Sequence, residues 1–166
     1  VILSQADTAM YMAKEQGKNR VVAYRHEDGV LARLAEDSQW ASRVKAALAE
    51  DRFVLHYQPL KRTSDDLVNH YEALVRMIGE SGETITPGSF IPVAERYGLM
   101  PQLDRWVFKQ VIHTLQSMPE IRIFMNLSGS SLADESLTSF IEGHLTRSGI
   151  DPGRLGFEIT ETAVVQ

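Results

Sequence analysis

The chain has 166 residues, a formal net charge of −5 and no cysteine, with 43% hydrophobic and 23% charged residues. The length suits one domain or one and a fraction, and the composition is that of a soluble globular protein. The negative charge argues against a nucleic acid polymer or an anionic membrane surface as partner, and the missing cysteines exclude disulfides and thiolate metal sites. No apolar run approaches the ~20 residues of a membrane span, so we expect a cytoplasmic segment of a longer protein.

The first part of the chain predicts one helix and one short strand. Small and apolar residues share one helical face up to Gly17, and a β-prone run follows over residues 20–24. One helix and one strand bury too little apolar surface for a core of their own. Residues 1–25 are therefore expected to be the tail of an upstream domain.

A longer helix is predicted over Val30–Glu50, where apolar residues recur at three- and four-residue steps. Its first part, within residues 26–42, is expected to link the upstream tail to a domain that begins at residue 43. Such a helix either connects two domains or lies against the second one. Another hypothesis is that it serves mainly dimer contacts, which would make this piece chiefly an interaction element.

Two strands are predicted next, Phe53–Leu60, which Pro59 is expected to end, and His70–Met77. The residues between them, 61–69, are mostly polar. A parallel crossover needs a dozen or more residues, so these two strands are predicted to pair antiparallel.

Helices and strands then alternate as far as the end of the chain. The predicted elements are a helix Ser89–Tyr97, a helix Pro101–Met118, a strand Ile121–Leu127, a helix Glu135–Arg147 and a strand Leu155–Thr160. This alternation predicts an α/β fold with a parallel sheet and helices outside it. Nothing in Ala163–Gln166 covers the last strand, so we expect the fold to continue or two copies to close on each other.

Polar residues at the ends of these apolar strands are the candidates for chemistry. Alternate residues of a strand share a face, which groups Glu72 with Leu74 and Arg76, and places Asn126 and Glu158 on the faces of two later strands. If the sheet curls into a barrel, these side chains can point inward near the carboxyl ends of the strands, where barrel enzymes assemble their sites. Carboxylate and amide oxygens suit Mg²⁺ or Mn²⁺.

Each of these residues also has an ordinary explanation, and spacing alone favours it. A glutamate at a strand end is usually solvated. Asn126 and the serines after it can form a helix cap or a turn. Arg76 can be a surface charge, and Gln58 before Pro59 is a common entry into a loop.

At these residues the chain resembles the EAL domains, which are cyclic di-GMP phosphodiesterases. The similarity extends over residues 43–165 and rests on strings that occur in the family's order: Tyr57-Gln58-Pro59, Glu72-Ala73-Leu74 with Arg76, Phe90-Ile91-Pro92-Val93-Ala94-Glu95, Gly98-Leu99, Asn126-Leu127-Ser128 and Glu158-Ile159-Thr160-Glu161. The first 24 residues resemble the end of a GGDEF (diguanylate cyclase) domain, through Ala6-Asp7-Thr8-Ala9-Met10-Tyr11 and Gly17-Lys18-Asn19-Arg20.

The resemblance implies the first half of a modified TIM (β/α)8 barrel whose first strand is antiparallel to its neighbour. It implies that Glu72, Asn126 and Glu158 hold Mg²⁺ or Mn²⁺, and that Glu161 supports catalysis together with the two other glutamates. The residues implied to bind the dinucleotide are Gln58, Leu74, Arg76 and Pro92, with Arg76 on a phosphate. The implied reaction is metal-dependent hydrolysis of cyclic di-GMP to linear pGpG.

The resemblance also implies partners and an alternative. The parent protein is expected to carry an upstream GGDEF domain and a sensor domain, and to form a homodimer. The family's Asp pair and Lys belong to the second half of the barrel, so residues 1–166 alone are expected to lack turnover. The alternative is a receptor that binds cyclic di-GMP without cleaving it and passes the signal to a partner.

Overall fold

The computed structural model describes residues 26–61, 63 and 68–159, together with 2, 5, 6, 9, 10, 13 and 19–23. The chain forms two compact units, Val1–Arg43 and Val44–Gln166. Within the described residues, no helix is long and apolar enough to cross a membrane. The helix stop expected at Gly17 lies outside the described residues. Residues 21–23 form no strand, and Val21 is exposed, so the strand predicted there has no partner in this part of the structure.

The first unit contains most of helix α2, which runs from His26 to Ala49. The predicted helix over Val30–Glu50 is therefore confirmed, with an earlier start. Within the first unit, the guanidinium of Arg43 lies 4.4 Å from the centre of the Trp40 ring, a cation–π contact between residues three apart on one helical face.

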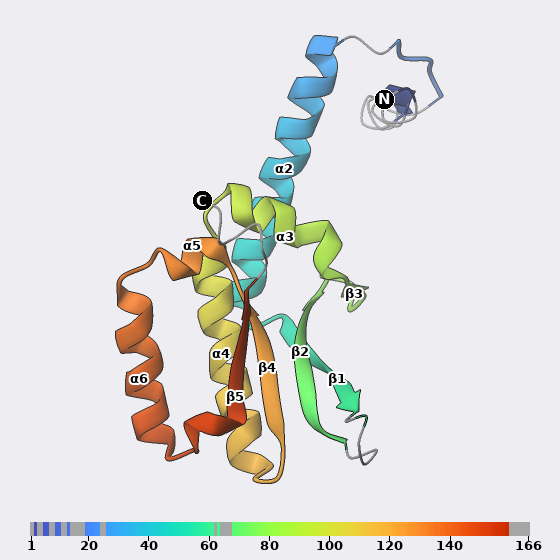
Figure 1. Cartoon of the computed structure of the whole chain (residues 1–166). Helices are drawn as coiled ribbons and strands as arrows, with labels where there is room; N and C mark the ends of the chain where they lie inside the picture. The colour runs from blue at the N-terminus through green and yellow to red at the C-terminus, as the bar shows by residue number, and fades with distance from the viewer. Residues whose placement is uncertain are drawn as a thin grey trace. The chain divides into compact units, whose positions relative to one another are not determined.

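The second unit is built on a mixed sheet with the strand order β1-β2-β4-β5, and β3 pairs with β2 outside this path (Figure 1). The bounds are Phe53–Lys61 for β1, Val68–Ile78 for β2, Thr84–Ile85 for β3, Arg122–Leu127 for β4 and Leu155–Ile159 for β5. β1 is antiparallel to β2, as the short connection predicted, whereas β2, β4 and β5 are parallel.

Helices alternate with the parallel strands. They are α3 (Pro87–Arg96), α4 (Met100–Ser117), α5 (Gly129–Leu132), α6 (Ser136–Ser148) and the 3-10 turn η1 (Pro152–Arg154). Figure 1 shows α4 and α6 on one side of the sheet, while α3 and α5 lie at the end toward which β2, β4 and β5 run. The alternation of helix and strand predicted from the sequence is confirmed.

One face of the sheet, which we call the outer face, packs against α4 and α6. Ile123 and Met125 of β4 are fully buried there against Val111 and Leu115 of α4. At the edge of this core, Tyr57 of β1 shares a hydrogen bond of 2.8 Å with the Thr114 hydroxyl, and burial raises the pKa of Tyr57 although this hydrogen bond opposes the rise. Because strand residues alternate, the core on the outer face leaves the next residues in sequence on the opposite face.

Two prolines lie inside their elements and not at the ends. Strand β1 continues through Pro59 to Lys61, past the predicted end. Within the described residues β1 is at one edge of the sheet, and an edge strand tolerates a residue without an N–H. Pro92 lies inside α3, because α3 begins at Pro87, before the predicted start at Ser89. The short elements β3 and α5 were not predicted, and both are too short to show a periodic pattern.

Candidate active site at the strand ends

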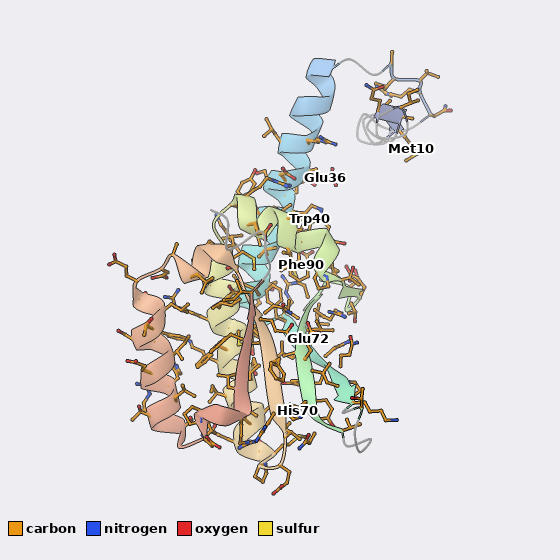
Figure 2. All side chains as sticks on the ribbon, in the orientation of Figure 1. Met10, Glu36, Trp40, His70, Glu72 and Phe90 are labelled. Atoms are coloured by element: carbon orange, nitrogen blue, oxygen red, sulfur yellow. The ribbon has the colours of Figure 1, made fainter. Side chains whose placement is uncertain are left out.

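The predicted ligands lie on the face of the sheet opposite α4, which we call the inner face. Glu72 pairs in register with Gln58 on β1 and with Phe124 on β4. Asn126 lies one same-face step beyond Phe124 and pairs in register with Glu158 on β5. Residues in register on neighbouring strands share a face and lie about 4.8 Å apart. Gln58, Glu72, Asn126 and Glu158, from four segments of the sequence, therefore lie on one face of the sheet. Figure 2 labels Glu72 on β2.

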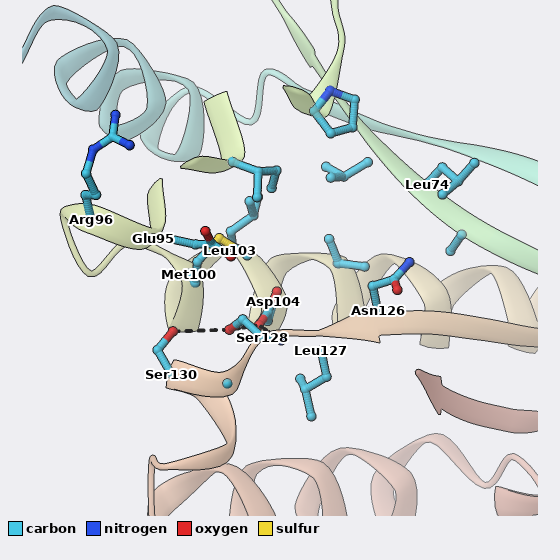
Figure 3. A pocket seen from close by; sticks show the side chains of 16 residues that line it. Leu74, Glu95, Arg96, Met100, Leu103, Asp104, Asn126, Leu127, Ser128 and Ser130 are labelled. Carbon is cyan, nitrogen blue, oxygen red and sulfur yellow. Dashed lines mark hydrogen bonds between the residues drawn. The ribbon is translucent and has the colours of Figure 1, made fainter. Parts of the chain in front are cut away.

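Glu72 and Asn126 are in direct contact. The Asn126 side-chain amide donates a hydrogen bond of 2.8 Å to Oε1 of Glu72. Figure 3 shows Asn126 and Leu127 pointing to opposite sides of β4, Leu127 being buried. Asn126 is therefore a residue of the inner face, and not the helix cap that the sequence left open; that role belongs to Ser128, whose hydroxyl accepts from the Ser131 backbone N–H at the start of α5.

The residues predicted to bind substrate lie in two places. Gln58, Leu74 and Arg76 share the inner face with Glu72, and Arg76 also donates a hydrogen bond of 2.8 Å to the Val75 carbonyl oxygen. Pro92 is exposed on α3, where its neighbour Ile91 lines a pocket. The inner face thus gathers most of the predicted substrate residues, with Pro92 on a helix beside them.

A pocket of about 620 Å³ opens at the carboxyl ends of β2 and β4. Its walls come from these strand ends, from α3, from the first turns of α4 and from the segment after β4, as Figure 3 shows. The residues that line it include Leu74, Ile91, Glu95, Met100, Leu103, Asp104, Asn126 and Ser128. Apolar walls with a few polar groups are typical of sites for small organic ligands.

The donor chemistry of the inner face fits a hard divalent cation. Glu72, Asn126 and Glu158 offer oxygen atoms and no sulfur or imidazole nitrogen. Across the described residues no group of three His, Cys, Asp or Glu is placed to hold a metal ion. Asn126, however, contacts Glu72 and pairs in register with Glu158, which puts an amide between two carboxylates. The amide nitrogen now faces Glu72, and a half-turn of the amide would present its oxygen instead.

Some site residues were missed or cannot be placed. Glu161, predicted to support catalysis, lies outside the described residues, as does Thr160. His56 was not predicted, although it lies on the inner face in register with Leu74. Its position follows from the antiparallel register, which the sequence does not specify.

Asp104 on α4 was also missed, and it organises the segment after β4. Its Oδ2 atom accepts hydrogen bonds from the Ser128 backbone N–H at 3.0 Å, from the Ser128 hydroxyl at 2.6 Å and from the Ser131 hydroxyl at 2.6 Å. A signal was present in the sequence, because Asp104 falls on the same helical stripe as Val107, Phe108 and Val111. An aspartate on a buried stripe needs polar partners.

The chain is similar to known proteins in sequence and in fold. The EAL domain family profile matches residues 41–166. The biofilm architecture maintenance protein MbaA of Vibrio cholerae is 36% identical over 166 residues, which cover 97% of this chain and 21% of MbaA. The cyclic di-GMP phosphodiesterase PdeB of Shewanella oneidensis is 32% identical over 170 residues, which cover 99% of this chain and 20% of PdeB.

A solved structure of the PaMucR phosphodiesterase in complex with cyclic di-GMP matches with a TM-score of 0.71 and 29% identity, over 77% of this chain and 54% of that one. The chain spans about a fifth of the length of the curated relatives named above. The mixed sheet with its antiparallel first strand is the first half of a TIM-like barrel, as the resemblance implied. Since the family profile covers more than half of its residues, the chain belongs to the EAL domain family.

Proposed function

We propose that the full-length protein hydrolyses cyclic di-GMP to linear pGpG with the help of Mg²⁺ or Mn²⁺. The observation that carries the proposal is the inner face itself, where Gln58, Glu72, Arg76, Asn126 and Glu158 lie together next to a pocket. The relative PdeB is named a cyclic di-GMP phosphodiesterase, and the PaMucR structure holds cyclic di-GMP. Both names support the same substrate for this chain.

In the proposed reaction, one water molecule is added across one phosphodiester bond. The water oxygen forms a bond to phosphorus, the bond from phosphorus to the 3′ oxygen breaks, and that oxygen receives a proton. A divalent cation held by Glu72, Asn126 and Glu158 would lower the pKa of the attacking water and offset negative charge on the phosphoryl oxygens. Arg76 would bind a second phosphate oxygen and orient the ring for attack.

The inner face contributes binding as well as ligands. Leu74 and Ile91 form an apolar wall of the pocket, suited to the flat face of a guanine base. Gln58 stands beside Glu72 on β1, where its amide can donate to or accept from the ligand. The upstream GGDEF domain, the sensor domain, the homodimer and the role of Glu161 remain parts of the proposal that rest on the family resemblance.

The test is a product assay on the full-length protein. Cyclic di-GMP is incubated with Mn²⁺, and the nucleotides are separated by chromatography. We expect stoichiometric conversion to pGpG, and a loss of more than 100-fold in kcat/KM for Glu158→Gln, which removes one anionic ligand. The matched control is Glu142→Gln, the same substitution on an exposed position of α6, which should leave the rate unchanged.

The result also separates hydrolysis from the receptor alternative. Recovery of uncleaved cyclic di-GMP bound to the wild-type protein, at saturating Mn²⁺ and over hours, would reject hydrolysis and establish a receptor. Formation of pGpG by residues 1–166 alone would instead contradict the expectation that the site needs residues beyond this chain.

A further inference from the structure

Asp104 is a buried carboxylate with an unusual set of partners. The residue is 5% exposed, and it lies on the first half of α4, where it is among the residues that line the pocket. Three hydrogen bonds to it end on Oδ2, and two of them come from hydroxyl groups at 2.6 Å. Such short bonds to an ionised acceptor are among the stronger hydrogen bonds in proteins.

These bonds hold the backbone at the point where β4 ends. Among the described residues, the pairing of β4 with β5 extends to Leu127, opposite Ile159, and the next backbone N–H along the chain is that of Ser128. Asp104 accepts from this N–H at 3.0 Å and therefore fixes the end of β4 relative to α4. Ser131, fully buried, adds a second link from α5 to the same oxygen atom.

Asn126 lies close along the chain to the residue that Asp104 holds. Asn126 precedes Ser128 by two residues on the same strand end, and its contact with Glu72 requires a 2.8 Å distance between side chains from two strands. Pairing of β2 with β4 is recorded from His70–Arg122 to Ala73–Met125 and stops before Asn126. Beyond Met125, two contacts hold this part of β4: the pairing of Asn126 with Glu158 on β5, and the hydrogen bond from the Ser128 N–H to Asp104.

We propose that Asp104 is a positioning residue for the candidate metal site, and that it acts by holding the end of β4 through Ser128 and Ser131 so that Asn126 meets Glu72. The proposal rests on the proposed function for the nature of the site. Mutation of residues that orient the metal ligands, without binding the metal themselves, typically lowers metal affinity by 10- to 100-fold. We therefore expect a measurable effect from Asp104, although its hydrogen bonds within the described part of the chain go to Ser128 and Ser131 and not to Asn126 or Glu72.

The test uses the 166-residue chain, Asp104→Asn and two readouts. The first is the side-chain amide cross-peak of Asn126 in a ¹H–¹⁵N spectrum without metal, and the second is Mn²⁺ affinity by titration calorimetry. Asn keeps the shape of Asp, and its amide oxygen can still accept in place of Oδ2, but the loss of the charge weakens all three hydrogen bonds. We expect the Asn126 cross-peak to shift or broaden and the affinity for Mn²⁺ to fall about 10-fold.

The chain contains a matched control in Asp134. This carboxylate also accepts from a serine hydroxyl and a backbone N–H, both of Ser136, and from Arg105 of the same helix α4. It lies between α5 and α6 and is not among the residues that line the pocket. Asp134→Asn should lower stability but leave the Asn126 cross-peak and the Mn²⁺ affinity unchanged. If Asp104 had a purely structural role, Asp104→Asn would give this same result.

The outcomes decide between the two roles. A folded Asp104→Asn chain with an unchanged Asn126 cross-peak and unchanged Mn²⁺ affinity would overturn the proposal. If wild type binds no Mn²⁺ but the cross-peak still shifts, Asp104 positions Asn126 and the metal part of the proposed function fails instead. If Asp104→Asn does not fold, Ser131→Ala, which removes one of the three hydrogen bonds, must give the same changes at smaller size, and no change there would overturn the proposal.

Discussion

The two faces of the sheet use the same strands for different purposes. On the outer face, Ile123 and Met125 are fully buried against α4, and any apolar side chains of similar volume could serve there. On the inner face, Glu72, Asn126 and Glu158 are accessible, and only oxygen donors at that register could hold a cation. Because the core and the proposed metal site use alternate residues of the same strands, we expect stability and metal binding to respond to different substitutions.

The largest effect on stability is expected at the outer face. Ile123→Ala removes a fully buried side chain from the middle of the core and should lower the free energy of unfolding by about 3 kcal/mol. Urea denaturation followed by circular dichroism measures this change. Mn²⁺ affinity of the protein that remains folded should stay within about threefold of wild type, because Ile123 faces away from the ligands. A loss of affinity as large as the loss of stability would show that the faces are coupled.

The next effect is expected at the inner face, where a substitution should lower Mn²⁺ affinity and leave stability nearly unchanged. Glu72→Gln removes the charge of a proposed metal ligand but keeps an oxygen that can accept from Asn126. We expect at least a 100-fold loss of Mn²⁺ affinity, which corresponds to about 2.7 kcal/mol, with a change of less than about 0.5 kcal/mol in the free energy of unfolding without metal. Calorimetry and urea denaturation on the same preparation measure both quantities.

The control for Glu72→Gln is Glu142→Gln, because Glu142 is exposed on α6. This variant should match wild type in both measurements. If Glu72→Gln destabilises the metal-free protein as strongly as Ile123→Ala does, Glu72 is a structural residue and the division between the faces does not hold.

The division between faces could be predicted from the sequence, since it follows from alternation along each strand. Glu72 with Leu74 and Arg76 was placed on one face by that rule, and the structure confirms the grouping. The antiparallel pairing of β1 with β2 was predicted as well, because the connection is too short for a crossover. Both predictions use only local geometry.

What the sequence could not predict depends on contacts between distant segments. The offset that brings Asn126 to Glu72 is a matter of register across two strands 54 residues apart in sequence. The Asp104 anchor joins α4 to the end of β4, and no local pattern states which donors an aspartate on a buried stripe will meet. Pro59 was expected to end β1, but the edge position of β1 allows the strand to continue.

The smallest effect is on stability at acid pH. It tests whether a contact in the helical layer outside the sheet can be weakened without a change at the inner face. The hydrogen bonds from Ser136 and then from Arg105 hold the pKa of Asp134 at about 2, below its ordinary value of 3.8. A lowered folded pKa means that the ionised form is stabilised in the folded protein. The contribution is therefore fully present above about pH 4 and is lost as the pH falls toward 2.

Asp134→Asn should remove this contribution, so the stability of the variant should approach that of wild type as the pH falls from about 4 to 2. Urea midpoints measured at intervals over that range show the convergence, which must be small because Asp134 lies at the surface. The Asn126 cross-peak at pH 7 should be the same in both proteins, since Asp134 and Arg105 tie α4 to the segment before α6 and not to β4. If the stabilities of both proteins fall in parallel with pH, the Asp134 carboxylate is not stabilised by Ser136 and Arg105. The helices outside the sheet would then lack the acid-sensitive contact that distinguishes them from the inner face.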